Sequence, residues 1–414
     1  MSRKRKERNH GDDDLETEIQ DFYDWFPSIS NDYKVVTKIG EGTFSTVYKA
    51  KDIRTTHYNN EDWIHLATFA EDDDHEEHDD FNQVIGSDAS SHQQQTPKPY
   101  VAIKRIYHTS SPERMLNEIS ILRDLRGSDH VVPLITAKRY EDQVVAVLPF
   151  FEHEDFRDYF HMMSLDEIKI YCRELFEALK HVHSKNIIHR DVKPSNFLYS
   201  RPRKRGVLAD FGLAQVIALD IQREEKPVPP KKRRVDAQIE AQLIAARGKP
   251  GYLVNDTRPS AKANRAGTRG FRAPEVLFKV QHQTTAIDIW SVGVIMLSLF
   301  TGLFPFFQSN DDGEALIEMG NLFGKKALKE LATRFNRTFD TNIPDISSRQ
   351  DLKKLCHSIR YLNAKKISDE GYDLLEQCFT LDPIARITAE QALSHPFLQL
   401  DDDDGDNAEE EVDK

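Results

Sequence analysis

The sequence predicts an α+β fold of two lobes, in which a small antiparallel β-sheet lobe with one main helix precedes a larger helical lobe. Residues 33–51 alternate apolar and polar side chains around a glycine-rich turn, which is the pattern of two strands joined by a loop. From about residue 150 to about residue 398 the pattern is mostly helical. With 414 residues, 39% of them hydrophobic, the chain is long and apolar enough to form both lobes.

The first lobe, residues 33–149, follows two short segments. Residues 1–14 are charged and predicted to be disordered. Residues 15–32 are predicted to hold a helix that packs on the lobe, because apolar residues recur there at helical spacing. A polar insertion occupies about residues 54–98 and is predicted to lie on the surface. Its apolar patch is too small for a core and consists of Trp63, Ile64, Leu66 and Phe69.

The second lobe, residues 150–398, has its own polar insertion at about residues 217–263. The acidic residues 399–414 are predicted to form a disordered tail. The net charge of −13 argues against direct, non-specific binding of nucleic acid.

The cysteine and hydropathy patterns indicate a soluble intracellular protein. The three cysteines, Cys172, Cys356 and Cys378, form no C-x-x-C pair, which argues against a zinc site and for a reducing compartment. The basic residues 1–8 are not followed by an apolar signal segment, and the apolar run at residues 295–300 is too short to span a bilayer.

The loop at residues 40–47 reads G-E-G-T-F-S-T-V. Glycines let backbone N–H groups approach phosphate oxygens closely. Ser45 stands where a third glycine is usual, and such a loop alone can equally be a tight hairpin. A dinucleotide fold would continue in a helix, whereas a second strand begins here near Val47, which favours a hairpin that covers phosphates.

The next strand ends in the sequence V-A-I-K at Lys104. A lysine at the end of an apolar strand needs solvent or an anion, so an ordinary edge lysine is one interpretation. Because Glu118 lies on the predicted helix that follows, an ion pair of Lys104 with Glu118 that holds the α- and β-phosphates of a nucleotide is better supported.

Residues 188–198 read I-H-R-D-V-K-P-S-N-F-L and give the strongest signal. Asp191 is predicted to accept the proton of an attacking hydroxyl and to orient it. Lys193 is predicted to neutralise charge on the transferred phosphate, and Asn196 to ligate Mg²⁺ through oxygen. His189 is expected to have a structural role.

Asp210, in the motif Asp-Phe-Gly, is the second predicted Mg²⁺ ligand. Further along the chain, a second motif, Ala-Pro-Glu, ends at Glu275. Arg386 is predicted to pair with Glu275, and Asp288 to anchor the backbone of the catalytic loop. In this order the motifs resemble those of eukaryotic protein kinases, which implies the bilobal kinase fold with ATP and Mg²⁺ as cofactors. Lys193 and a threonine at position 268, which would bond Asp191 and Lys193, indicate serine/threonine specificity.

Longer strings resemble one kinase family, the catalytic subunit of the Dbf-dependent kinase (DDK). They are IGEGTFSTVYKA, YVAIKRIYHTSSPERMLNEI, DQVVAVLPFFEHEDFR, IIHRDVKPSNFLYS, GVLADFGLA and ANRAGTRGFRAPEVL. The resemblance covers about residues 33–398, both insertions included, and the low cysteine content is typical of a fungal member. The insertions are shorter than in many relatives, and the second lacks cysteine, so no zinc is inferred.

The resemblance implies a regulatory subunit of the Dbf type that supports the helix with Glu118 and grips the second insertion. It also implies the MCM replicative helicase as substrate, at serines followed by acidic or phosphorylated residues. Arg265 and Arg272 near Thr268 match the positions that read this anion, and Arg269 is a weaker third candidate. Alternatively, one of these arginines binds a phosphorylated activation loop.

The resemblance further implies an ATP site with Leu148 as gatekeeper and residues 149–151 as the hinge to adenine. The predicted ATP-binding residues are Ile39, Gly40, Glu41, Gly42, Thr43, Phe44, Ser45, Val47, Ala102, Lys104, Leu148, Pro149, Phe150, Phe151 and Leu198. The basic clusters at residues 3–6 and 231–234 resemble nuclear import signals, although solvated charge runs are the alternative. We therefore expect a nuclear protein.

Two other functions stay open on the sequence. Another acidophilic serine/threonine kinase, of the casein-kinase type, would generally lack this Ala-Pro-Glu arrangement and the long insertion before it. A pseudokinase scaffold would usually lack a catalytic residue, and none is lost here.

Overall fold

The computed structural model describes residues 10–42, 45–69, 98–107, 110–217, 266–341, 343, 348–359 and 366–399, with residues 10–14 described by their backbone alone. The chain divides into two compact units, Met1–Glu152 and His153–Lys414, and each is taken by itself below. The predicted two-lobed α+β architecture is confirmed. The ends of the chain at 1–9 and 400–414, most of the first insertion and nearly all of the second lie outside the described residues.

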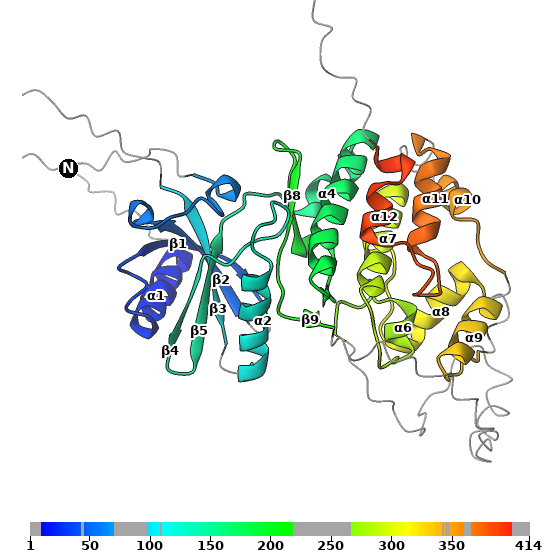
Figure 1. Cartoon of the computed structure of the whole chain (residues 1–414), viewed down its shortest axis with the longest axis horizontal. Coiled ribbons are helices and arrows are strands. Elements are labelled where there is room, and N and C mark those ends of the chain that lie inside the picture. Colours follow the sequence, from blue (N-terminus) through cyan, green and yellow to red (C-terminus); the bar gives the residue numbers. More distant parts are fainter. Residues whose placement is uncertain are drawn as a thin grey trace, which may run out of the picture. The chain divides into compact units, whose positions relative to one another are not determined.

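The first unit is built on a five-stranded antiparallel sheet with the strand order β1-β2-β3-β5-β4 (Figure 1). The strands are β1 Tyr33–Glu41, β2 Ser45–Asp52, β3 Tyr100–Ile106, β4 Thr136–Tyr140 and β5 Gln143–Pro149. The helices are α1 His10–Trp25 and α2 Pro112–Asp124, with short 3₁₀ turns at Thr55–His57 and Ile64–Leu66.

The two faces of this sheet carry different chemistry, because successive side chains of a strand point to opposite sides. Ile103 of β3 lies opposite Tyr48 of β2, and both belong to a buried core. Helix α1 covers this face with Phe22 and Phe26, and the Phe22 ring lies 4.9 Å from the Tyr48 ring. Lys104 therefore points to the other face, on which α2 packs.

Helix α1 begins at His10, five residues before the predicted start. The sequence prediction rested on apolar spacing, which begins only at residue 15. Acidic residues at 12–14 favour the positive N-terminal end of a helix without adding an apolar signal.

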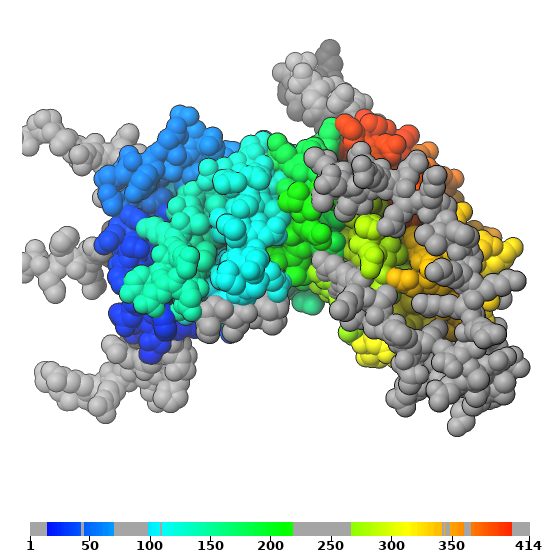
Figure 2. All heavy atoms as spheres, turned by 60° about the horizontal axis from the view of Figure 1, so that its bottom comes forward, coloured from blue at the N-terminus to red at the C-terminus, as the bar shows by residue number. Residues whose placement is uncertain are grey.

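The first insertion is not wholly a surface segment, and this prediction was wrong for its beginning. Trp63, Leu66 and Ala67 are buried, and Trp63 and Ala67 join the core under the sheet. The apolar patch needs no core of its own, because Trp63 and Ala67 join the core that α1 forms with the sheet. Phe69 remains 43% exposed. Figure 2 shows residues 45–69, in lighter blue, packed onto the rest of the first unit.

The second unit is mostly helical. Its helices are α3 Phe156–Tyr159, α4 Leu165–Ser184, α6 Pro274–Leu277, α7 Ala286–Thr301, α8 Asp312–Phe323, α9 Lys325–Arg334, α10 Leu352–Ser358, α11 Asp369–Cys378 and α12 Ala389–Leu393. Two small antiparallel pairs join β6 Ile187–Ile188 with β9 Gln215–Val216, and β7 Phe197–Ser200 with β8 Arg205–Leu208. Short 3₁₀ turns lie at Phe160–Met162, Pro194–Asn196 and Pro396–Leu398.

Helix α7 is buried along its whole length and forms the centre of the second unit. Its apolar residues explain this position, because a helix that is apolar on all sides must be surrounded by protein. Across the part of the chain that the structure describes, we find no helix with the length and apolarity needed to cross a bilayer.

Candidate active site

The first group of candidate residues, in the first unit, is an ion pair on the face of the sheet against which α2 packs. Lys104 Nζ lies 2.7 Å from Glu118 Oε1, and both residues are buried. Strand β3 fixes the lysine between β2 and β5, and α2 begins with Ser111 as its N-cap. The ion pair predicted from the sequence is confirmed, and its role in holding phosphates remains a prediction.

The glycine-rich loop joins β1 to β2. The N–H of Gly42 donates to the carbonyl of Ser45 at 2.8 Å, which closes the turn, while Thr43 and Phe44 lie outside the described residues. Among the described residues, a Cβ atom added at Gly40 or Gly42 would meet no atom nearer than 3.8 Å. Since the fold itself leaves room for a side chain, glycine here fits the close approach of a ligand such as a triphosphate.

For some of the predicted ATP-binding residues, the register of the strands shows that the side chain lies on the same face of the sheet as Lys104. Val47 lies opposite Lys104, and Leu148 opposite Ala102. Ile39 is on β1 and 43% exposed, Glu41 forms an ion pair with Lys38, and Ser45 begins β2.

The predicted hinge begins at Pro149, the last residue of β5, and Phe150 after it has both backbone groups bonded. The N–H of Phe150 donates to the Tyr100 carbonyl, and its own carbonyl accepts from Thr68. Both the N–H and the carbonyl of Phe150 are thus hydrogen-bonded within the first unit. A contact of Phe150 with adenine would therefore involve its side chain, and the adenine contacts of residues 149–151 remain predictions.

The second group of candidate residues is the catalytic loop of the second unit, where Asp191 is buried and held on both oxygens. Its Oδ1 accepts from the N–H and the hydroxyl of Thr268, at 2.7 and 2.6 Å. Its Oδ2 lies 2.9 Å from Lys193 Nζ and 3.0 Å from Asn196 Nδ2. Lys193 also donates to the Thr268 hydroxyl at 2.8 Å. The predicted bonds of Thr268 to Asp191 and Lys193 are confirmed.

These contacts keep Asp191 ionised. Burial by itself would raise the pKa of Asp191, but the hydrogen bonds from Thr268 and the ammonium group of Lys193 outweigh it. The pKa consequently lies below its usual range, and near neutral pH the group is a carboxylate that can accept a proton and orient a hydroxyl.

A glycine brings Thr268 to the catalytic loop. Gly267 has φ +105°, and a Cβ there would lie 2.3 Å from the Arg190 carbonyl oxygen. Only glycine tolerates both the backbone conformation and this close approach. The residue that follows is thereby held against Asp191.

Asp288 and His189 hold the loop from behind. The Asp288 carboxylate accepts from the backbone N–H of His189 at 2.8 Å and of Arg190 at 2.9 Å, as predicted. His189 Nε2 lies 3.0 Å from the Ala209 carbonyl, and its Nδ1 accepts from the N–H of Asp191. Because a carbonyl only accepts, the proton of His189 is on Nε2.

Asn196 and Asp210 carry the oxygen atoms predicted for Mg²⁺. Asn196 Nδ2 donates to the carbonyl oxygen and to Oδ2 of Asp191. The amide oxygen Oδ1 is therefore the Asn196 atom that could ligate a cation. Asp210 is exposed and has φ +62°, while Phe211 beside it is buried against His189. Leu198, on β7, is partly exposed.

These two side chains fit a magnesium ion that arrives with a nucleotide. No group of three or more His, Cys, Asp or Glu side chains that could hold a metal occurs among the described residues. Mg²⁺ usually takes one or two protein oxygens and completes its shell with phosphates and water. Bound MgATP would supply the γ-phosphoryl group that is transferred.

The predicted scaffold pair is also confirmed. Arg386 contacts both carboxylate oxygens of Glu275, at 2.7 and 3.1 Å, and both side chains are almost fully buried. The guanidinium lies over the Trp290 ring and donates to the Ala286 carbonyl as well. The pair fixes the end of the segment that carries Thr268.

The arginines predicted to read substrate have partners in the structure. Arg272 donates twice to the Gly267 carbonyl and once to Asp312 Oδ1, at 3.0 Å. Arg269 donates to the Asn310 carbonyl. Arg265 lies outside the described residues.

Two sets of residues around these groups have no signal in the sequence. Arg190 donates to Gln283 at 2.6 Å and to Gln215 at 2.7 Å, so neutral amides hold the arginine that precedes Asp191. Asp312 is the acidic partner of Arg272. Neither glutamine nor Asp312 belongs to a motif, and only the fold brings them to their arginines.

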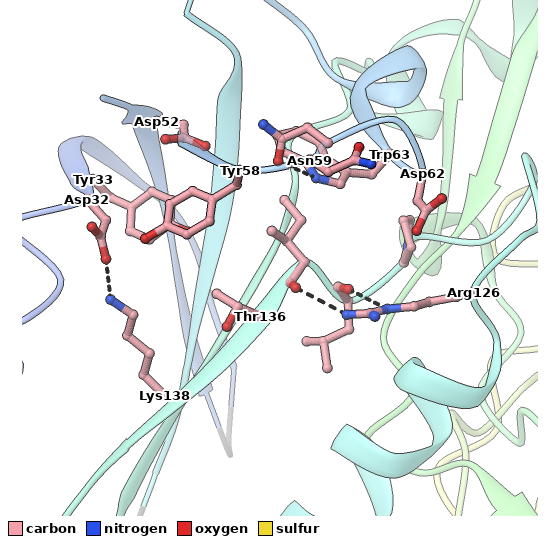
Figure 3. Close-up of a pocket in the computed structure, with 14 residues that line it drawn as sticks. Asp32, Tyr33, Asp52, Tyr58, Asn59, Asp62, Trp63, Arg126, Thr136 and Lys138 are labelled. Atoms are coloured by element: carbon pink, nitrogen blue, oxygen red, sulfur yellow. Dashed lines mark hydrogen bonds and ion pairs between the residues drawn. The ribbon is translucent and has the colours of Figure 1, made fainter. Parts of the chain in front are cut away.

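A cavity of about 330 Å³ in the first unit is separate from these groups. Figure 3 shows the ion pair of Asp32 with Lys138 at one side, and Arg126 bonded to two backbone carbonyls at the other. None of the residues predicted to bind nucleotide or to act in catalysis lines it. We assign no catalytic role to this cavity.

Comparison with known proteins identifies the family. A protein kinase domain model matches residues 86–230 and 251–398. The cell cycle serine/threonine-protein kinase hsk1 of Schizosaccharomyces pombe is 43% identical over 93% of this chain and 76% of its own. A probable cell division control protein 7 homolog of Encephalitozoon cuniculi is 40% identical over 88% of this chain and 92% of its own. The chain belongs to the cell division cycle 7 family of serine/threonine protein kinases.

The kinase fold and family predicted from the motifs are thus confirmed. The cell cycle protein kinase spo4 of Schizosaccharomyces pombe is 39% identical over 92% of this chain and 88% of its own. The two Schizosaccharomyces pombe relatives agree with the fungal type that was predicted. The protein is a cell-cycle serine/threonine kinase, and a kinase domain implies ATP as phosphoryl donor.

Proposed function

We propose that this kinase transfers the γ-phosphate of MgATP to serines followed by an acidic or phosphorylated residue, most of all on the MCM replicative helicase. It acts in the nucleus, with a Dbf-type regulatory subunit, to start DNA replication. Family membership together with the intact Asp191 group, held by Thr268 and Lys193, is the observation that supports phosphoryl transfer over a scaffold role.

The candidate groups of each unit have an assigned role in this reaction. Lys104, paired with Glu118, contacts the α- and β-phosphates, and the loop around Gly40 and Gly42 covers them. Asn196 and Asp210 hold the magnesium ion. Asp191 orients the serine hydroxyl and accepts its proton, while Lys193 balances charge on the phosphate.

The regulatory subunit is proposed to act on α2, which carries Glu118. Leu116 on this helix is 68% exposed, which suits a helix that a partner covers. The proposed import signals at residues 3–6 and 231–234 lie outside the described residues, so the nuclear location rests on sequence and family.

The first test uses the purified chain with and without a Dbf-type subunit, on an MCM tail peptide. Activity that appears only with the subunit, and that is higher for acidic-flanked than for alanine-flanked serines, supports the proposal. Full activity of the chain alone, unchanged by the subunit, indicates another acidophilic kinase. MgATP binding without turnover in the complex indicates a scaffold.

The second test concerns the acidic residue after the serine. An acidic substrate residue bound to Arg272 competes with Asp312, which accepts a hydrogen bond from Nη1 of that guanidinium at 3.0 Å. Arg272→Ala is therefore expected to lower, and Asp312→Asn to raise, the ratio of kcat/KM for acidic-flanked over neutral-flanked peptides. Hydrogen bonds to charged groups contribute about 1.5–3 kcal/mol, so losing one would change this ratio by about 10- to 150-fold. Equal ratios in both variants and the wild type contradict a role of Arg272 in specificity.

A further inference from the structure

A cavity of about 490 Å³ opens in the second unit beside the catalytic loop. Lys193 and Thr268 line one part of it, and both residues hold Asp191. A polypeptide with its serine at Asp191 therefore runs past the mouth of this cavity. Its volume is within the usual range for ligand sites, about 300–1,000 Å³.

The floor of the cavity is aromatic. The Phe304 ring lies 4.9 Å from Phe156, 5.9 Å from Phe160 and 6.5 Å from Phe271, measured between ring centroids. Phe156, Phe271 and Phe307 are buried, whereas Phe304 is only partly covered. Phe304 therefore offers the cavity an exposed apolar surface, while the other three phenylalanines of its lining are buried by neighbouring residues.

The walls are held in place without a ligand. Ser291 of α7 donates to the Phe271 carbonyl at 2.8 Å. Gly270 has φ +81°, and a Cβ there would lie 3.1 Å from the Phe307 carbonyl oxygen, so glycine permits this approach. Arg269 then ties the same wall to the carbonyl of Asn310. A preformed floor gives affinity because little order is lost on binding.

The charges at the rim do not favour one sign. The Arg157 guanidinium lies 5.8 Å from the Phe304 centroid, and Asp155 lies 3.9 Å from Arg157. Glu154 also lines the cavity. Lys193 and Arg269 line the cavity as well, so it carries cations and carboxylates together, and we assign recognition to the aromatic floor.

We propose that this cavity binds one large apolar side chain of the protein substrate, aromatic or leucine, within about four residues of the phosphorylated serine. Lys193 and Thr268 contact Asp191 and also line the cavity, so the site begins close to the phosphorylated serine. An extended chain advances about 3.3 Å per residue, so four residues on either side cover about 13 Å. The proposal rests on phosphoryl transfer at Asp191, and it adds a second specificity element to the proposed acidic residue. The cavity thus selects sequence on a different part of the substrate.

The test uses the complex of this chain with its regulatory subunit and a parent peptide of alanines around one Ser-Asp pair. Phenylalanine replaces each of the four alanines before and after that pair in turn. Burial of one such side chain is expected to raise kcat/KM about tenfold at one position. Phe304→Ala should reduce the ratio between that peptide and its parent to near one, whereas Phe304→Leu should keep most of it.

Two outcomes overturn the cavity proposal. One is that the wild-type complex phosphorylates the parent peptide but shows no preference for phenylalanine at any position. This outcome needs no variant. The other is a preference that survives unchanged in Phe304→Ala. A phenylalanine preference with equal rates for Ser-Asp and Ser-Ala parents supports the cavity and removes the proposed acidic specificity instead.

Discussion

The two hydrogen bonds from Thr268 to Asp191 predict how catalysis responds to one hydroxyl group. Thr268→Val removes the hydroxyl, whose oxygen lies 2.6 Å from Asp191 Oδ1, and keeps both the side-chain volume and the backbone N–H. It also removes the acceptor of the 2.8 Å bond from Lys193. Thr268→Ser retains the hydroxyl and is the matched control.

The magnitude follows from the charge of Asp191. A hydrogen bond to a charged group is worth about 1.5–3 kcal/mol. If the transition state loses that much, kcat/KM falls about 10- to 150-fold in Thr268→Val. Because a donor to the carboxylate is lost, the pKa of Asp191 rises toward its ordinary value, and the acid limb of the pH–rate profile moves to higher pH.

The assay is kcat/KM of the complex with its regulatory subunit on one peptide, measured from acid to neutral pH for the wild type and both variants. Thr268→Ser should stay close to the wild type in rate and in pH profile. A Thr268→Val enzyme with the wild-type rate and an unmoved acid limb would refute the role assigned to this hydroxyl.

Two further predictions concern the second unit. Arg386→Ala leaves Glu275 buried and unpaired, so the free energy of unfolding, measured with urea, should fall by about 3–5 kcal/mol. Arg334→Ala is the control: its 2.7 Å pair with Asp382 is exposed, and the same measurement should change by less than about 1 kcal/mol. Similar losses in the two variants would contradict the assigned burial. Burial raises the pKa of the thiols of Cys172 and Cys356 to about 12. Iodoacetamide at pH 8 should therefore leave both unmodified in the native protein and modify them in urea, and rapid native alkylation would count against the described packing.

The catalytic loop could be predicted because its chemistry fixes residue types at fixed spacing. Asp191, Lys193 and Asn196 lie within six residues, so local sequence was enough to identify them. The pair of Glu275 with Arg386 spans 111 positions, yet both members belong to kinase motifs, and these motifs predicted the pair.

Contacts without a motif could not be predicted. Asp312 meets Arg272, and Gln215 and Gln283 meet Arg190, only because helices and loops distant in sequence converge there. The burial of Trp63 was missed for a related reason. A residue in a polar segment can complete a core that other elements supply, and sequence patterns of that segment alone do not reveal it.

The aromatic cavity also had no signal in the sequence. Phe156 and Phe304 are 148 positions apart and belong to segments that sequence analysis did not connect. Their rings lie 4.9 Å apart because α3 and the loop after α7 meet in the fold. Motifs identify reacting groups, whereas the surfaces that select a substrate depend on tertiary structure.

The central claim is that the Asp191 carboxylate accepts the proton of the substrate hydroxyl. Asp191→Asn keeps the shape of the side chain and removes its charge. We predict that phosphate transfer to a peptide by the complex falls about 10²- to 10⁴-fold, while the affinity for MgATP stays close to that of the wild type. Transfer by Asp191→Asn at the wild-type rate would contradict the account.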